Sequence, residues 1–561
     1  MTDDYDTILL TLTTMMGRVA YDIGNRPWEF CDYVSWRPKI PAPRLRRDAN
    51  TLRRLPSPEP RRRRQSGAKR RAERTLFPDA LDSKGMMFVI KDSTFRILRQ
   101  VAFALIVAAS RLEVGLVIGW SAVLPKLRAD NATSFTVTDQ DVTWLVSLPG
   151  ISGVAMTLAI GPLIEFTGPT RLLRALLFLA GVLWLLQAFT PYLSLLYLGR
   201  LGSCLAFNVV GPLAPALISE LVEPSVRGSL VAVVEAVVAL GQLAVYCLAD
   251  ALPWRLTTAV CGAPFFVVFV LAFWVPESPY WLLRQDRPED AAKALSRLRG
   301  SVKDTSVELD EIAVGVKERP QSTLKDQVKQ LTVPQNFRPV LFLASVFVLR
   351  ELGGQYVVFS YTVYLFREAG VSMDAYTCTI LVGAVRLACT VLGSLLLDRV
   401  GRRPMLLATG VVCGLAELVG GAFLLGQFPG ASWVPLAAVL VFVSSYGLGM
   451  SPIPWVLLGE LLPPAVRSVG TSICVFNFAL SIFVVSYTFP PLVEHAGVGT
   501  ALIAFAGFHA VLSVVTWAFL PETRGKSLSD LKDAFTSAPK EADDAAAGEG
   551  KGTENTKDTN V

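Results

Sequence analysis

Long apolar runs separated by short polar segments make up most of the chain after about residue 99. Each run is roughly 20 residues long, which is the length that a helix needs to cross a bilayer. Backbone polar groups in hydrocarbon must find partners within their own segment, so such runs form helices. The pattern predicts twelve membrane-spanning helices, at 99–125, 141–164, 172–191, 194–219, 229–250, 256–275, 337–361, 376–397, 404–427, 433–458, 469–491 and 498–520.

Polar landmarks between these runs occur twice. Pro276-Glu277-Ser278 follows the sixth run and Pro521-Glu522-Thr523 follows the twelfth, 245 positions later. Two acid–base pairs with a spacing of seven residues also match each other: Glu220 with Arg227, and Glu460 with Arg467. This repetition predicts an all-α polytopic membrane protein with two pseudo-symmetric six-helix bundles, a common construction of transporters.

The polar segments suggest how the chain is divided. The first tail is rich in proline, which opposes a stable helix there, and Arg287-Pro288-Glu289-Asp290 has the composition of a helix start. We expect a basic disordered cytoplasmic tail, an N-terminal bundle, a cytoplasmic helical linker, a C-terminal bundle and a second cytoplasmic tail, at 1–98, 99–276, 277–332, 333–520 and 521–561.

Composition agrees with a membrane protein. The chain has 561 residues, of which 52% are hydrophobic and 18% charged, whereas soluble domains carry about a quarter of charged residues. Arginines crowd the first tail between residues 42 and 74. This segment could contact anionic lipid, but we expect disorder with at most incidental lipid contact. The expected surroundings are the lipid bilayer, with no nucleic acid as a partner.

The distribution of Lys and Arg predicts orientation. The basic tail and the basic short loops fall on one side when twelve spans are threaded, which places both termini in the cytoplasm. Asn131 begins an N-glycosylation sequon in the first outside loop. We therefore expect a multi-pass protein of the cell membrane, glycosylated at Asn131.

Residues that would indicate an enzyme are missing from the pattern. Seven of the eight cysteines lie inside predicted spans, and no CxxC pair is present. His495 and His509 are the only histidines, and no nucleotide-binding or nucleophile motif occurs. We expect no catalytic residues, no metal site, no cofactor and no use of ATP.

Several motifs, in a fixed order, resemble those of a known family. They are Gly199-Arg200, Pro276–Pro279, Asp398–Arg403, Pro452–Trp455 and Pro521–Leu528. From about 99 to 535 the chain is similar to the sugar porters of the major facilitator superfamily, and among them to insect facilitated trehalose transporter-like proteins. The resemblance implies transport of a sugar or related small solute, with two bundles rocking around a central site.

The resemblance also implies a charged gate at the cytoplasmic ends of the spans. Arg402 and Arg403 would contact Glu460 and Arg467 would join them, while Glu220 and Arg227 would serve the first half; Glu277 belongs to the same gate. Exposed ion pairs contribute only about 0.2–1 kcal/mol each, so they would bias a conformational equilibrium. The alternative is that these charges merely mark helix ends at the cytoplasmic face.

Two departures weaken the gate in the first half. The family carries basic residues after Gly168, where this chain has Pro169 and Thr170, with Arg171 following. Tyr280 replaces the arginine that usually follows the first Pro-Glu-Ser-Pro. Either Arg171 substitutes for the missing cation from a later position, or the first half of the gate is looser.

The central site departs further from the family. Positions that hold amide side chains in sugar porters fall on charged or aromatic residues here, and only the tryptophan is retained outright. The substrate-binding candidates are Trp455, Tyr356, Asn477, Glu351, Arg386 and Glu235. Asn477 matches its counterpart when one residue of slippage is allowed.

Ionised side chains at membrane depth are costly and are functional candidates by default. Arg350 and Glu351 are sequence neighbours, so we expect each to find its partner on another span. Arg386 with Glu351 or Glu235 is the expected pairing. The alternative is a structural ion pair that only holds the helices together.

The sequence favours facilitated diffusion. Proton-coupled relatives carry an acid where this chain has Ser121, which would leave Arg200 without that partner, although Glu113 could replace it. Two alternatives stay open: proton-linked transport of a sugar or charged organic solute, and a membrane nutrient sensor that does not transport.

Overall fold

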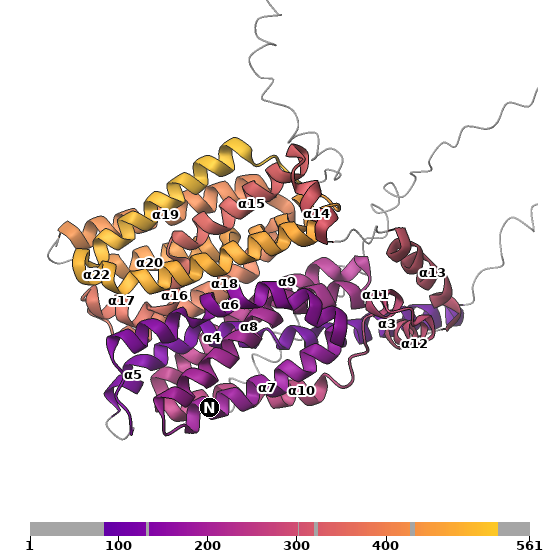
Figure 1. Ribbon diagram of the computed structural model, residues 1–561, viewed down its shortest axis with the longest axis horizontal. Coiled ribbons are helices and arrows are strands. Elements are labelled where there is room, and N and C mark those ends of the chain that lie inside the picture. The colour runs from indigo at the N-terminus through magenta and orange to yellow at the C-terminus, as the bar shows by residue number, and fades with distance from the viewer. Residues whose placement is uncertain (1–82, 131–133, 301, 319–323, 427–431, 525–561) are drawn as a thin grey trace, which may run out of the picture. The chain divides into compact units, whose positions relative to one another are not determined.

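The computed structural model describes residues 83–130, 134–300, 302–318, 324–426 and 432–524, which are mainly helical and contain no strand (Figure 1). Eleven helices in these ranges are long and apolar enough to cross a membrane. The last, α22 (Arg467–Phe519), has 53 residues, and its length of roughly 80 Å far exceeds one bilayer. Gly497 interrupts it with φ 80°, so α22 covers both final predicted spans. The predicted all-α membrane fold is confirmed.

The first half consists of the helices that precede Pro276. A short interruption at Ser110 and Arg111 divides its first span. The helices are α3 (Ser83–Ala109), α4 (Leu112–Gly119), η2 (Trp120–Val123), α5 (Leu124–Ala129), α6 (Asp139–Thr167), α7 (Pro169–Phe189), α8 (Leu193–Leu221), α9 (Pro224–Ala251) and α10 (Trp254–Leu271).

Short helices connect the halves in sequence. They are α11 (Pro279–Arg284), α12 (Pro288–Arg299), α13 (Val302–Glu318) and α14 (Leu324–Leu331). Helix α12 begins at the predicted proline and ends at Gly300, which has φ 94°. Ala291 and Ala294 of α12 pack on Trp281 and Leu282 of α11. These small apolar contacts form a separate cluster, as short amphipathic helices require.

The second half contains the remaining helices. They are α15 (Pro334–Leu352), α16 (Gln355–Ser360), α17 (Thr362–Glu368), α18 (Ala375–Val400), α19 (Arg402–Gly426), α20 (Val434–Ser445), the π-helix η3 (Tyr446–Met450), α21 (Ile453–Leu461) and α22. Asn131 and most of both tails lie outside the described residues.

Two spans of the second half lose regular α-helical geometry near their middle. The seventh breaks at Gly353 and Gly354 between α15 and α16, where Gly354 has φ 77°. The tenth passes through the π-turn η3 between α20 and α21. Broken helices and π-turns commonly form binding sites, because they free backbone groups and redirect side chains.

The two halves meet near these interruptions. Helix α6 packs against α22, and α9 packs against α18. The Tyr246 hydroxyl of α9 donates to the Phe359 carbonyl of α16 at 2.6 Å, and Trp144 of α6 stacks edge-on against Tyr487 of α22 at 5.1 Å. Helix α16 therefore lies at the contact between the halves.

Candidate functional site

The glutamate of the second repeated motif, Pro521-Glu522-Thr523, caps the N-terminus of α19. The Glu522 carboxylate accepts hydrogen bonds from the backbone amides of Arg402 at 3.1 Å and Arg403 at 3.2 Å, the first residues of α19. Gly401 precedes them with φ 100°, and a Cβ there would lie 2.9 Å from the Glu522 carboxylate. A carboxylate at a helix N-terminus satisfies free amides and complements the helix dipole.

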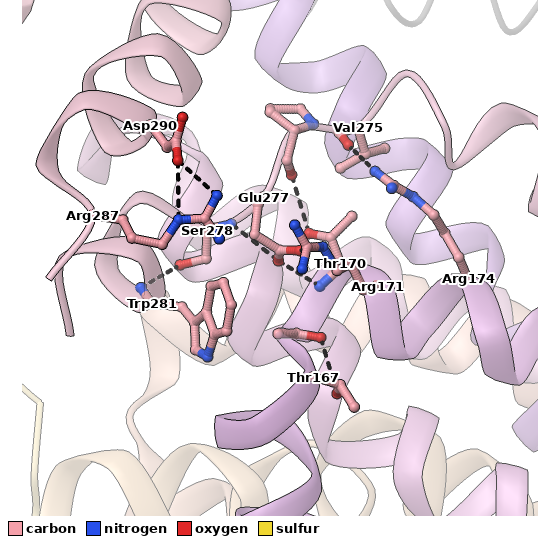
Figure 2. A network of polar contacts seen from close by, with 12 residues as sticks. Thr167, Thr170, Arg171, Arg174, Val275, Glu277, Ser278, Trp281, Arg287 and Asp290 are labelled. Carbon is pink, nitrogen blue, oxygen red and sulfur yellow. Dashed lines mark hydrogen bonds and ion pairs between the residues drawn. The ribbon is translucent and has the colours of Figure 1, made fainter. Parts of the chain in front are cut away.

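The first motif repeats this arrangement, as Figure 2 shows. Glu277 accepts from the Thr170 amide at 2.8 Å, at the start of α7, and Gly168 precedes the helix with φ 88°. Arg171 lies 3.9 Å from the same carboxylate. Arg171 therefore supplies a cation near Glu277, where the family carries a basic residue in place of Thr170.

The hydroxyl that follows each glutamate makes the second repeated contact. Ser278 donates to Glu220, and Thr523 donates to Glu460 at 2.6 Å. In the second half Arg402 also pairs with Glu460 at 3.1 Å. Each motif thus links the end of its sixth span to the end of its fourth, and these contacts stay within one half.

The remaining gate candidates make further contacts at the same ends of the spans. The Arg403 guanidinium donates to the Trp517 carbonyl at 2.8 Å, so the expected contact with Glu460 is wrong. The Arg403 backbone amide is bonded to the Glu522 carboxylate, while the Arg403 side chain points to the end of α22. Arg467 donates to the Leu462 carbonyl. Arg227 has a buried Nε without a hydrogen-bond partner.

Glu522 is expected to contribute stability only when it is ionised. Burial favours a higher pKa for its carboxyl, but hydrogen bonds from the amides of Arg524, Arg402, Arg403 and Thr523 hold the pKa below its usual value of 4.5. The contribution is therefore present above pH 4.5 and lost as the pH falls through the lower, folded-state value. Glu522→Gln should cost about 0.3–1 kcal/mol at neutral pH.

Thermal unfolding of the detergent-solubilised protein between pH 3.5 and 7 checks this prediction. Wild type and Glu522→Gln should differ most at neutral pH and converge toward the acid end. A difference that grows on acidification would contradict the cap.

Glu460→Gln is expected to shift the balance between inward-facing and outward-facing states. The change removes the ion pair with Arg402, whose side chains are 14% and 28% exposed, so about 1 kcal/mol or a fivefold shift is expected. Cysteine accessibility on each side of the membrane, together with solute flux, measures it.

Asp290→Asn is the control. Asp290 pairs with Arg287 at 2.6 Å, and its side chain is 40% exposed; neither side chain bonds a described residue of the two repeated networks. Unchanged flux and unchanged state balance in Glu460→Gln would rule out the gating role.

A charged cluster surrounds the break in the seventh span. Arg350 donates to the Tyr446 hydroxyl of η3 at 2.7 Å and to the Gln355 side chain at 3.1 Å. Gln355 in turn donates to Glu351. The Arg350 Nε lies 3.8 Å from the Glu351 carboxylate. The expectation of a partner on another span therefore holds for Arg350, which bonds Tyr446, and is wrong for Glu351. Because the helix breaks at Gly353, Gln355 lies where it bridges both side chains.

Arg386 of α18 lies beside this cluster. Its guanidinium is 4.2 Å from the Phe359 ring and 5.6 Å from the Tyr446 ring, and the residue is 4% exposed. Its Nε and Nη1 are buried without hydrogen-bond partners. The expected pairing of Arg386 with Glu351 or Glu235 is wrong, because both acids are held by other arginines.

Glu235 of α9 pairs with Arg111 at 2.7 Å. Arg111 also donates to the Gly211 carbonyl of α8 at 2.6 Å, so it joins three spans of the first half from the interruption after α3. The Ser451 hydroxyl, directly after η3, lies 3.5 Å from Glu235. Glu235 therefore touches the second half. Arg111 was missed from sequence, although an arginine inside the first predicted span is itself a signal.

The neutral candidates lie around the same helices. Tyr356 of α16 is buried, and its hydroxyl donates to the Val146 carbonyl of α6 at 3.3 Å. Trp455 packs edge-on against Phe347 and Phe478, at 5.1 and 5.3 Å. Asn477, next to Phe478, donates to the Ile473 carbonyl of its own helix at 2.8 Å. Trp455 thus belongs to an aromatic group with Phe347 of α15 and Phe478 of α22, whereas Tyr356 bridges the halves.

Unpartnered polar atoms gather in the charged cluster. Buried atoms without hydrogen-bond partners include Arg350 Nη1, Glu351 Oε2, Ser360 Oγ, Arg386 Nε and Nη1, and Thr390 Oγ1. Buried polar atoms in proteins are nearly always paired. A concentration of unpaired donors and acceptors at a helix break indicates a place where a polar solute can bind.

A further acid and a further base lie at membrane depth. Glu113 accepts from the Trp184 indole at 3.1 Å, and Arg200 donates to the Val117 carbonyl at 2.8 Å and stacks on Trp120. Backbone carbonyl groups therefore accept some of the hydrogen bonds that Arg200 can donate. Glu113 lies near enough to Arg200 to interact with it electrostatically.

Glu417 and His509 were missed as a pair. Glu417 of α19 lies 2.8 Å from His509 Nδ1 of α22, and both are buried. Glu417 also lines an apolar pocket between α17, α19, α20 and α22. A glutamate inside an apolar run was the available signal. All residues that line this pocket belong to the second half, and Val358 of α16 is one of them.

Known proteins resemble the chain over most of its length. The model of the family described as "Sugar (and other) transporter" matches residues 108–535. The facilitated trehalose transporter Tret1 of Culex quinquefasciatus is 31% identical over 443 residues, which cover 77% of this chain and 85% of the relative. The Tret1 of Polypedilum vanderplanki is 30% identical, with 80% and 91% covered. The chain spans only about half the length of other relatives, such as 54% of the Aedes aegypti Tret1.

Solved structures share the fold. The partially occluded inward-open xylose transporter XylE from E. coli matches with a TM-score of 0.64 at 22% identity, over 76% of this chain and 99% of that one. XylE described as a proton:xylose symporter bound to 6-bromo-6-deoxy-D-glucose matches with a TM-score of 0.63 at 24% identity, over 78% and 99%. The family comprises multi-pass membrane transporters rather than enzymes, and this chain belongs to the sugar (and other) transporter family.

Proposed function

We propose that the chain carries a sugar or a related small polyhydroxylated solute across the membrane by alternating access of its two halves. The observation that carries this proposal is the set of unpartnered buried donors and acceptors at the break of the seventh span. Hydroxyl groups donate and accept at once, so they suit a site that offers both. Relatives named as trehalose transporters support the substrate class.

The proposed binding residues lie around this break. Glu351, Arg386 and Tyr356 would contact the polar solute, while Trp455 and Asn477 would flank it and Glu235 would connect the site to the first half. Charged ends of the spans would gate it, through the repeated network described above. The gate would involve Glu277 and Glu220 with Arg227 in the first half, and Glu460, Arg402, Arg403 and Arg467 in the second.

Facilitated diffusion is the proposed mode. The relatives' printed names describe facilitated transport, and Ser121 stands where proton-coupled sugar porters carry an acid. Proton coupling is the second candidate, because Glu113 is buried beside Trp184 and near Arg200. A membrane nutrient sensor without transport is the third.

Uptake of radiolabelled trehalose and glucose into proteoliposomes tests these candidates. Facilitated transport predicts saturable uptake that equilibrates and is unaffected by a protonophore. Uptake that accumulates solute only under a proton gradient would favour coupling. Tight binding of solute without flux would favour the sensor and contradict the proposed function.

We also propose the plasma membrane as the location, with both termini in the cytoplasm. The basic loops and the sequon at Asn131 support this orientation. Removal of a glycan by amidase in wild type, and its absence in Asn131→Gln, would place that loop outside. Modification of an epitope on either terminus by an impermeant reagent on intact cells would contradict it.

A further inference from the structure

We infer that the preferred solute carries an anionic group, a carboxylate or a phosphate, which binds Arg386. This inference rests on the proposed transport function and names the chemistry of its substrate. It follows from the balance of buried charges where the halves meet.

Two other buried cations near the site have an acidic partner. Arg111 pairs with Glu235 at 2.7 Å, and Arg350 lies 3.8 Å from Glu351. Among the residues that the structure describes, no carboxylate lies within ion-pair distance of Arg386 and no acceptor is hydrogen-bonded to it. One positive charge therefore remains uncompensated in the cluster.

The surroundings of Arg386 favour an anion over a neutral group. Phe359 and Tyr446 lie against the guanidinium at 4.2 and 5.6 Å, and ring faces stabilise a cation without accepting its in-plane N–H groups. Nε and Nη1 are both buried and unpartnered. Carboxylate and phosphate oxygens bind a planar guanidinium in its plane, with stronger hydrogen bonds than neutral acceptors form.

The groups beside Arg386 suit the hydroxylated remainder of such a solute. Thr390 lies one turn further along α18, and its hydroxyl is buried without a partner. Ser360 Oγ and Glu351 Oε2 provide a further hydroxyl and an acceptor. Sugar acids and sugar phosphates combine these features, because they carry several hydroxyl groups and one anionic group.

Transport by the purified protein in proteoliposomes tests the inference. D-Glucose, D-glucuronate and D-glucose 6-phosphate would be compared as radiolabelled solutes. We expect one of the two anions to enter wild-type vesicles with a kcat/KM about tenfold or more above that of glucose. The anion that does so distinguishes a carboxylate from a phosphate ligand.

Arg386→Asn should lower anion uptake about tenfold or more and lower glucose uptake much less, because it keeps a polar amide and removes the charge. Arg386→Lys keeps the charge and should retain the anion preference. Arg287→Asn is the control, because Arg287 pairs with Asp290 and both side chains are exposed. Arg386→Lys and inhibition of wild-type glucose uptake by each anion provide the test should Arg386→Asn not fold.

The outcomes separate the two proposals. Wild-type uptake of glucose without preference for, or inhibition by, either anion would overturn the anionic substrate and leave sugar transport standing. An equal loss of glucose and anion uptake in a stably folded Arg386→Asn would also overturn it. Failure to transport any of the three solutes, or trehalose, would overturn the proposed transport function itself.

Discussion

Glu235→Gln should destabilise the protein by about 2–3 kcal/mol and reduce solute uptake strongly. The change leaves Arg111 inside the first half with the Gly211 carbonyl but without its carboxylate. Breaking a fully buried pair costs about 3–5 kcal/mol, and the smaller value reflects side chains that are 10% and 20% exposed. Thermal unfolding in detergent and uptake into proteoliposomes measure the two effects.

A double variant separates structure from function at this pair. Arg111→Met with Glu235→Leu replaces both charges by apolar side chains of similar size, which commonly restores stability. Restored stability with restored uptake would show that the pair only holds the helices together. Restored stability without uptake would assign Glu235 to the transport site, where it contacts Ser451 of the other half. Unchanged stability in Glu235→Gln would contradict the buried pair altogether.

Gly354→Ala should produce a loss of similar size through a different mechanism. Gly354 has φ 77°, and a Cβ there would lie 2.2 Å from the Phe505 ring of α22. Left-handed geometry costs a residue with a side chain roughly 1–2 kcal/mol, and overpacking a core costs about 1–3 kcal/mol more. The break of the seventh span would shift, so uptake should fall with stability.

Variants at two other glycines separate backbone strain from steric overlap of the new Cβ. Gly370 has φ 62° with nothing within 4 Å of a built Cβ, so Gly370→Ala should show strain alone. Gly507 is helical with nothing within 4 Å, so Gly507→Ala should be neutral or slightly stabilising. Thermal unfolding of all three variants measures the series. A Gly354→Ala loss no larger than that of Gly370→Ala would contradict the close contact with Phe505.

The spans could be predicted from hydrophobic length alone, because a bilayer imposes one physical requirement on every segment. The twelve predicted runs correspond to eleven long helices, since α22 continues through Gly497 and covers two of them. The repeated motif also showed from the sequence that Glu277 and Glu522 occupy equivalent positions in the two halves. Their identical role as caps of α7 and α19 appeared only in three dimensions, because each carboxylate reaches a loop more than 100 residues away.

Side-chain pairing at membrane depth could not be predicted. Sequence reasoning paired Arg386 with Glu351 or Glu235, whereas Arg350 and Arg111 hold those acids. Which acid pairs with which arginine depends on the position of Gln355 after the helix break and on the end of α3 near Arg111. Both are set by packing between helices, which one-dimensional periodicity does not encode.

The sequence by itself determined the membrane class, the all-α architecture, the two-part repeat and the family. These follow from hydrophobic length and from motifs that are local in the chain. The tertiary structure alone decided which charges compensate each other and which stay unpaired. Ion pairs and hydrogen bonds depend on distances of a few ångströms between distant segments, and only the packed helices define those distances.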